Sequence, residues 1–147
     1  MKLTKNARVV LNLRYLKKDV KGNVIETPED LFRRVAKNIA LADNKYNKKT
    51  VKQTEKEFLD LLLNLDFLPN SPTMFNAGRP LQQLAGCFVL PIDDDIDSIF
   101  HALHQTAVIH KSGGGTGFSF SRLRPRGDIV GTTQGVASGP VSFMKIF

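Results

Sequence analysis

The sequence has only one cysteine, Cys87, and no long uninterrupted apolar run. A single thiol excludes a disulfide within the chain and any metal site that needs several cysteines from one chain. Because no stretch of about 18 apolar residues occurs, we expect no membrane-spanning helix and no membrane partner. Residues 1–19 alternate polar and apolar side chains instead of forming the apolar core of a signal peptide, so we expect a cytoplasmic protein.

The sequence is also short of acidic residues, with a formal net charge of +7. The excess lies in residues 1–66, which contain 15 Lys and Arg against 9 Asp and Glu. A basic segment attracts nucleic acid or polyphosphate through long-range electrostatics. Here the lysines are scattered among acids, which favours a solvated helical surface. We therefore expect no nucleic-acid partner.

Length and hydropathy pattern together indicate a folded chain of mixed α/β class. The 147 residues are 41% hydrophobic, which excludes a disordered or fibrous chain, but they are too few for a complete barrel of about 250 residues. Residues 7–16 alternate as a half-buried strand does, and residues 24–26 follow a turn as a short second strand. Helical spacing predicts one helix that is capped by Thr27 and ends near residue 44. It predicts a second helix over residues 51–66, which is capped by Thr50.

The helical pattern ends at Leu68–Pro72, where two prolines and an asparagine stand. Beyond this segment the chain has fewer charges and more glycine. We therefore predict a small, mostly helical domain over residues 1–67 and a different domain over residues 68–147.

The second domain begins as an α/β structure. Residues 84–90 form a short apolar run, which predicts a buried strand containing Cys87. A helix follows over residues 95–111 and ends at glycines, and residues 117–123 alternate as a second strand. A strand, a helix and a strand in this order predict a βαβ unit with parallel pairing.

Two features at this point of the chain each leave two interpretations open. The glycine-rich run at residues 111–117 does not match a Walker phosphate loop, because its lysine comes first and the run follows a helix instead of opening one. It is either a tight turn or a loop that lets a ligand approach the main chain. Cys87 is either a small apolar residue of the strand or a redox-active thiol.

Charged and titratable side chains flank the predicted βαβ unit. Arginines alternate over residues 122–126 and suit a polyphosphate, with a solvated strand end as the alternative. Residues 93–95 are three aspartates, which cap the helix or hold ribose hydroxyls. His101 and His104 share a helix face, but no third ligand is evident, so we expect no metal site.

Four long motifs stand out in the second half of the chain. They are LPNSPTMFNAG (68–78), GCFVLP (86–91), HKSGGGTGFSFSRLRP (110–125) and SGPVSFM (138–144). Together they closely resemble the catalytic chain of ribonucleotide reductase, in the style of the adenosylcobalamin-dependent (class II) enzymes. Arg14–Leu16 and the helix that starts at Thr27 resemble the N-terminal helical domain of the same family, so the resemblance covers essentially the whole chain.

The resemblance implies a substrate site. Cys87 matches the first-strand cysteine of the pair that reduces the substrate ribose and ends as a disulfide. The segments that line the pocket near the substrate's phosphates and ribose are matched by Ser71, Gly86, Gly113, Gly114 and Gly115.

The resemblance also implies an effector site for a deoxynucleoside triphosphate. Asp94 matches the acid that holds the effector's ribose, and Arg124 matches a basic residue near its phosphates. The helix over residues 95–111 would then belong to the surface of a homodimer on which the effector lies.

The implied fold is a helical domain followed by the first strands and helix of a ten-stranded α/β barrel, truncated. The family's chemistry needs a thiyl radical on another cysteine and a partner thiol for Cys87, and both come from later barrel strands. We therefore expect a truncated, split or intein-interrupted portion that is inactive alone and needs the remainder of the catalytic chain. The complete enzyme would use a ribonucleotide substrate, adenosylcobalamin bound mostly outside this segment, and an external thiol reductant such as thioredoxin.

Other interpretations stay open at this point. The chain also fits the large subunit of a class I ribonucleotide reductase, whose radical comes from a separate subunit. From a different class of protein, it fits a standalone nucleotide-binding module without catalysis. The motifs leave both ribonucleoside diphosphates and triphosphates open as substrates.

Overall fold

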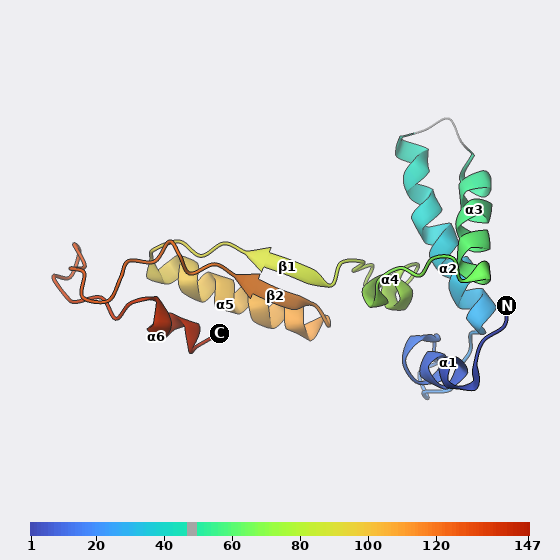
Figure 1. Cartoon of the computed structure of the whole chain (residues 1–147), viewed down its shortest axis with the longest axis horizontal. Coiled ribbons are helices and arrows are strands. Elements are labelled where there is room, and N and C mark those ends of the chain that lie inside the picture. The colour runs from blue at the N-terminus through green and yellow to red at the C-terminus, as the bar shows by residue number, and fades with distance from the viewer. Residues whose placement is uncertain (47–49) are drawn as a thin grey trace. The chain divides into compact units, whose positions relative to one another are not determined.

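The computed structural model describes residues 1–46 and 50–147, and the chain divides into two compact units, Met1–Ala85 and Gly86–Phe147 (Figure 1). The first unit is helical and the second contains a two-stranded sheet, so the chain has the predicted mixed α/β class. None of the helices in the described ranges is long and apolar enough to cross a membrane.

The first unit begins with two short helical segments where the sequence predicts a strand. α1 (Lys5–Val10) is capped by Thr4, whose hydroxyl accepts the Ala7 N–H at 3.1 Å. The chain continues without a break into the π-helix η1 (Leu11–Tyr15). The predicted strand over residues 7–16 is therefore wrong.

The alternating apolar residues of this segment do not share one buried face. Val9 and Leu13 are 48% and 67% exposed, whereas Leu11, Tyr15 and Leu16 pack on the hydrophobic core. Leu11 and Tyr15 are four positions apart, which is a helical spacing. The segment therefore packs on the core as a helix does, although its apolar residues alternate in the sequence.

A tight turn connects η1 to the next helix. Lys18 pairs with Val24 in one isolated antiparallel bridge. Gly22 lies in the turn with a φ of 86°, a conformation that glycine adopts at little cost. The second strand predicted at residues 24–26 is thus reduced to a single bridge.

Two long helices follow at the predicted positions. α2 (Pro28–Ala40) opens with a capping box, in which Thr27 Oγ1 accepts the Asp30 N–H and the Asp30 carboxylate accepts the Thr27 N–H, both at 3.2 Å. A 3₁₀ turn, η2 (Leu41–Lys45), extends this helix. α3 (Val51–Asn64) follows, and both helices confirm the predictions from spacing and caps.

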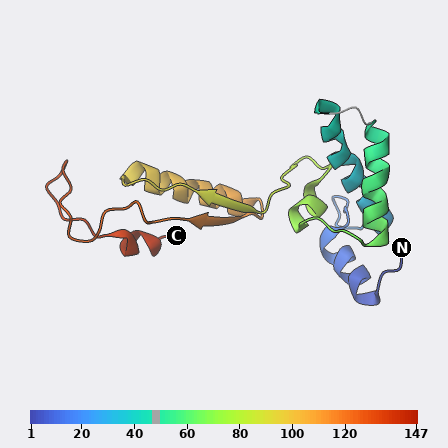
Figure 2. The same ribbon diagram turned by 45° about the horizontal axis from the view of Figure 1, so that its top comes forward.

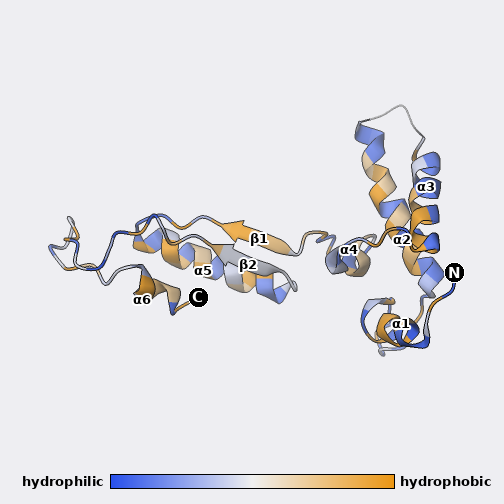
Figure 3. Cartoon of the chain, in the orientation of Figure 1, coloured by the Kyte–Doolittle hydropathy of each residue, from blue (hydrophilic) through white to orange (hydrophobic). Residues whose placement is uncertain are grey.

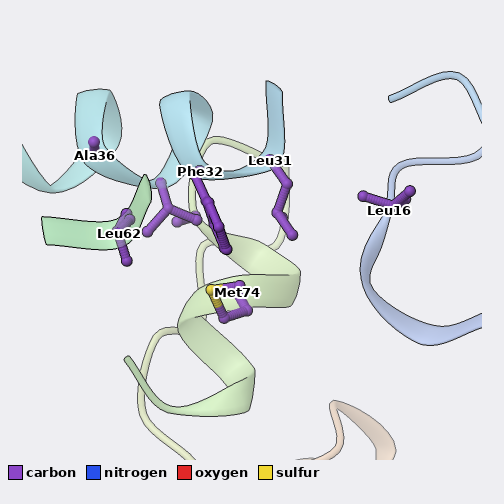
Figure 4. Packing of buried hydrophobic residues seen from close by; sticks show 8 residues of the cluster. Leu16, Leu31, Phe32, Ala36, Leu62 and Met74 are labelled. Carbon is purple, nitrogen blue, oxygen red and sulfur yellow. The ribbon is translucent and has the colours of Figure 1, made fainter. Parts of the chain in front are cut away.

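The core of the first unit lies among α2, α3 and α4 (Ser71–Asn76). Figure 4 shows Leu31 and Phe32 extending from α2 toward Met74 of α4, with Leu62 of α3 close by. Leu31 and Phe32 are 0% and 2% exposed, and burial of such a side chain contributes roughly 1.5–3 kcal/mol. Figure 3 shows apolar and polar residues interleaved along α2 and α3, as amphipathic helices require.

The α4 helix packs in the first unit although it lies beyond the predicted boundary at residue 67. Met74 and Ala77 belong to the same core cluster as α2, and the compact unit extends to Ala85. The predicted division into domains over residues 1–67 and 68–147 stays a prediction.

A mostly buried charged network joins three parts of the first unit. The Glu26 carboxylate lies 2.6 Å from Arg34 Nε and 3.7 Å from an Arg79 guanidinium nitrogen, and the three side chains are 7%, 14% and 25% exposed. Glu26 also accepts the Lys17 N–H at 2.9 Å, and Arg34 donates to the Ala77 carbonyl. Burial lowers the pKa of Arg79, the neighbouring Arg34 charge lowers it further, and Glu26 opposes both. The network ties the turn before α2 to α2 and to the chain after α4.

The second unit contains the predicted βαβ arrangement. β1 (Cys87–Leu90) pairs in parallel with β2 (Gly115–Phe118), and α5 (Ile96–Lys111) connects them. Figures 1 and 2 both show the two strands lying along α5. The short helix α6 (Pro140–Met144) comes last. Parallel pairing and the connecting helix confirm the prediction.

β2 begins and ends earlier than the strand predicted over residues 117–123. The Gly115 N–H already donates to a main-chain carbonyl before β1 at 2.7 Å, and the chain turns where the Leu123 N–H donates to the Phe120 carbonyl at 3.2 Å. Phe118 and Phe120 both pack against the apolar cluster of this unit. Their alternation therefore reflects packing across a turn as well as along a strand.

The strand β1 is not buried, contrary to the prediction. Cys87 is exposed and Val89 is 84% exposed, whereas Phe88 and Leu90 are half-buried. Successive side chains of a strand point to opposite faces of a sheet, and Phe88 lies on the α5 side, near Ile109 and Gly114. Among the described residues of this unit, nothing covers the face that carries Cys87.

The apolar cluster of the second unit is small and rich in phenylalanine. Phe147 packs edge-on against Phe118, with ring centroids 4.5 Å apart. The buried members of the cluster are Ile92, Ile99, Ala102 and Leu123.

Replacing Glu26 with glutamine tests the charged network. Glutamine keeps the size of the side chain but leaves Arg34 and Arg79 without their counter-charge in a mostly buried site. We expect the free energy of unfolding to fall by about 2–3 kcal/mol, measured by urea denaturation followed by circular dichroism. Glu29→Gln, at an exposed position in the first turn of α2, is the control and should cost less than about 1 kcal/mol. Equal losses in the two variants would contradict the role given to the network.

Candidate functional site

The candidate residues of the second unit lie at the two ends of its βαβ arrangement. Because the strands are parallel and α5 runs back between them, the start of each strand lies at the C-terminal end of α5. The 16 residues of α5 span about 24 Å. Gly86, Cys87 and Gly113–Gly115 lie at one end, and Asp94 and Arg124 lie at the other.

Strand pairing brings the cysteine and a glycine together. Cys87 is the register partner of Gly115 in the parallel sheet. Next to this pair, the Gly115 N–H donates to the Gly86 carbonyl at 2.7 Å. The thiol is exposed, on the face of the sheet away from α5. The structure thus brings Gly86, Cys87 and Gly115 to one place, at the start of the strands.

The glycine turn between α5 and β2 depends on glycine at two positions. Gly113 has a φ of 85°, in the left-handed region. At Gly114, an added Cβ would lie 2.6 Å from Ile109 Cγ2 and 2.9 Å from the Phe88 ring. The backbone is held by hydrogen bonds to the end of α5, including that from the Gly114 N–H to the Ile109 carbonyl at 3.0 Å. A close-fitting turn of bare main chain therefore lies beside the start of β1.

A hydrogen bond that no sequence motif predicts closes this turn. His110 Nε2 and Thr116 Oγ1 lie 3.0 Å apart, across the glycines. The two residues flank the glycine run in the sequence, and this placement was the only sequence feature that could have suggested a contact between them. The bond links the last turn of α5 to β2.

At the other end of α5, the acidic run and the alternating arginines meet. Arg124 donates to the Asp94 carboxylate from Nε at 2.7 Å and from its main-chain N–H at 3.1 Å. Arg122 and Asp93 form an exposed ion pair at 2.8 Å. Asp95 caps α5 by accepting the Ser98 N–H at 2.8 Å.

The contacts from Arg124 change the acidity of Asp94. The backbone N–H of Arg124 lowers the pKa of this carboxyl group below its ordinary value of 3.8, and the guanidinium adds to the effect through a hydrogen bond and its charge. Partial desolvation acts in the opposite direction. Asp94 is therefore a carboxylate at neutral pH, so it can accept hydrogen bonds but not donate them.

A cleft of about 540 Å³ lies at this end of the unit. Asp94 and Arg124 stand on its wall together with Ser138, and apolar side chains such as Ile99 and Phe143 complete the lining. A cleft with an apolar surface and a few charged groups is suited to a small organic ligand that carries polar substituents.

Ser71 belongs to the first unit and is the first residue of α4. Its side chain is exposed, and its hydroxyl lies 3.0 Å from the hydroxyl of Tyr15. Tyr15 lies within the Arg14–Leu16 motif, but its contact with Ser71 could not be predicted from the sequence, because 56 positions separate the two residues.

The two histidines of the shared helix face, His101 and His104, are both exposed on α5. Across residues 1–46 and 50–147, the structure contains no group of three His, Cys, Asp or Glu side chains that could hold a metal ion.

Comparisons with known proteins place both units in one family. Residues 1–82 match the all-alpha domain of ribonucleotide reductase, and residues 85–147 match its barrel domain. The chain therefore belongs to the ribonucleotide reductase family.

Curated relatives match along the whole chain. It is 46% identical to a vitamin B12-dependent ribonucleoside-diphosphate reductase of Thermoplasma acidophilum and 48% identical to one of Mycobacterium tuberculosis, with 100% of this chain covered in each case. A ribonucleoside-diphosphate reductase large subunit of Arabidopsis thaliana is 38% identical over 87% of the chain and 15% of its own length. The chain spans 26% and 21% of the first two relatives, and the single cysteine stands in the part that matches the barrel domain.

Replacing Gly114 with alanine tests the glycine turn. The new methyl group would overlap Ile109 and Phe88, so we expect a loss of about 1–3 kcal/mol in the free energy of unfolding, measured by urea denaturation. Gly117→Ala is the matched control in β2, because its Cβ would meet nothing within 4 Å. The control should change stability by no more than about 0.5 kcal/mol. A Gly114→Ala variant as stable as the control would contradict the close fit.

The Asp94–Arg124 pair predicts a pH dependence with a defined sign. Because folding lowers the pKa of Asp94 below 3.8, its stabilising contribution is present above this value and is lost as the pH falls through the lower, folded-state pKa. The difference in unfolding free energy between the wild type and Asp94→Asn should be constant from pH 7 to pH 5 and shrink at pH 3. Arg124→Gln should show the same profile, and a difference that grows on acidification would contradict the pairing.

Proposed function

We propose that this chain is part of the catalytic chain of an adenosylcobalamin-dependent ribonucleoside-diphosphate reductase, which makes deoxyribonucleotides for DNA synthesis. One observation carries the proposal: in a chain of this family, the single cysteine is exposed at the start of β1, directly beside a turn of bare main chain. The relatives at 46% and 48% identity are named as vitamin B12-dependent, which favours this class over the class I alternative. Their names also favour ribonucleoside diphosphates as substrates.

The reaction determines what Cys87 has to do. Reduction replaces the 2′-hydroxyl of the ribose with hydrogen, and the hydroxyl leaves as water. Two thiols supply the two electrons and two protons, and they become a disulfide. Cys87 supplies one of these thiols, and the other comes from outside this segment, since the sequence holds a single cysteine. An external dithiol of the thioredoxin type then reduces the disulfide.

The proposal assigns substrate contacts to glycines beside Cys87 in the second unit and, separately, to Ser71 in the first unit. Gly86 and Gly113–Gly115 have no side chains, so their main-chain N–H and C=O groups can be approached closely by a nucleotide. Ser71 contributes a hydroxyl that can donate to a substrate oxygen. The exposed face of β1 fits this role, because a thiol that reduces a bound ribose has to reach it directly.

The cleft at the other end of α5 suits a deoxynucleoside triphosphate effector. Asp94 can accept a hydrogen bond from the ribose hydroxyl, and Arg124 can donate to the phosphates. The apolar side chains Ile96, Phe100 and Val108 of α5 are 58%, 47% and 50% exposed, which supports α5 as the surface of a homodimer.

Adenosylcobalamin is proposed on the names of the relatives, and when bound it supplies the radical that starts the reaction. The cleft of about 540 Å³ is too small for a corrin ring with its nucleotide tail. This cleft therefore does not hold the cofactor, and we place most of the cofactor's contacts outside this segment. The thiol reductant, the cytoplasmic location and the inactivity of the segment alone stay predictions.

Cys87→Ser in the complete reductase tests the proposed function. The variant should lose multiple turnover with the external dithiol, because serine cannot form the disulfide, while binding of the effector stays as in the wild type. Product formation is measured by chromatography of the deoxynucleotides, and effector binding by calorimetry. Continued turnover in the variant would refute the role of Cys87, and a requirement for a separate radical-generating subunit would favour class I.

A further inference from the structure

Tyr15 is held firmly where three parts of the helical unit meet. Its ring stacks on Phe75 of α4, with centroids 4.6 Å apart and an angle of 11° between the planes. Its carbonyl accepts a hydrogen bond from Arg79 at 3.0 Å, and Arg79 in turn belongs to the charged network around Glu26. The next residue, Leu16, is buried in the core. The position of the Tyr15 hydroxyl is therefore fixed from both the ring and the main chain.

Ser71 has a fixed backbone but few constraints on its side chain. Asn70 caps α4 by accepting the Thr73 N–H at 3.2 Å, and its amide group donates to the Leu84 carbonyl at 2.9 Å. These bonds set the main chain at Ser71. A serine side chain has three staggered rotamers, and the contact with the Tyr15 hydroxyl at 3.0 Å holds it in one of them.

The number of hydrogen bonds that each hydroxyl group can donate and accept indicates what this contact can do. Each hydroxyl has one proton to donate and two lone pairs that accept. When Tyr15 donates to Ser71, a Ser71 lone pair is satisfied and the serine keeps its own proton. That proton is then free to be donated to an anionic oxygen of a ligand.

We propose that Tyr15 is a positioning residue for the nucleotide substrate: its hydroxyl fixes the Ser71 side chain in the rotamer that donates to a phosphate or ribose oxygen. The inference rests on the proposed function, because that function places Ser71 at the substrate. Tyr15 acts through Ser71 and does not itself touch the nucleotide.

Tyr15→Phe in the complete reductase tests the inference. Phenylalanine keeps the stacking on Phe75 and removes only the hydroxyl, so we expect the melting temperature and kcat to stay as in the wild type. KM for the ribonucleotide should rise about three- to tenfold, the range that one neutral hydrogen bond supplies. Tyr46→Phe is the matched control, because Tyr46 is the other tyrosine of the chain and is 81% exposed. It should leave KM unchanged.

A second variant shows whether the effect passes through Ser71. Ser71→Ala should raise KM at least as much as Tyr15→Phe, and the double variant should match Ser71→Ala alone, because nothing is left for the tyrosine to position. An unchanged KM in Tyr15→Phe, additive effects in the double variant, or a lower melting temperature with normal KM would each overturn the inference.

The outcome can be separated from a failure of the proposed function. If Cys87→Ser is inactive and Tyr15→Phe has a normal KM, the function stands and the positioning role fails. If Cys87→Ser retains multiple turnover, the proposed role of the thiol fails, whatever KM the tyrosine variants show.

Discussion

The parallel pairing of β1 with β2 is the constraint on which the candidate site depends. The pairing brings Cys87 into register with Gly115 and places the glycine turn beside the thiol. It also requires a connection that crosses from the end of one strand to the start of the next, which α5 supplies. The same helix separates the thiol end from the cleft at Asp94 by about 24 Å. One short βαβ arrangement therefore places the Cys87 thiol at one end of α5 and the Asp94–Arg124 pair at the other.

The helices and strands that could be predicted from the sequence are those specified by neighbouring residues, such as caps and regular spacing. Threonine caps, helical spacing and the glycine stop gave α2, α3 and α5, and the order of strand and helix gave the parallel pair. The strand predicted at residues 7–16 was wrong, because alternation alone does not show which residues reach the core. The burial of β1 was also wrong, because an apolar run does not show what covers the second face of a sheet.

The candidate site was partly predictable for the same physical reason. Motifs pointed to the glycines and the cysteine as candidates, and strand pairing brings Gly86, Cys87 and Gly115 together, while their roles stay predictions. They did not reveal Tyr15 beside Ser71 or the network around Glu26, since these contacts join segments far apart in the chain. The family matches over residues 1–82 and 85–147 confirm the family that the motifs indicated.

The central claim is that Cys87 is one half of a redox pair whose other sulfur lies outside this segment. The most direct test is to mix the reduced complete enzyme with substrate for one turnover, without external reductant, and to map its disulfides by alkylation and mass spectrometry. The account predicts that Cys87 is recovered in a disulfide with a cysteine from another part of the catalytic chain, in proportion to the product formed. Recovery of Cys87 as a free, alkylated thiol after product has formed would contradict it.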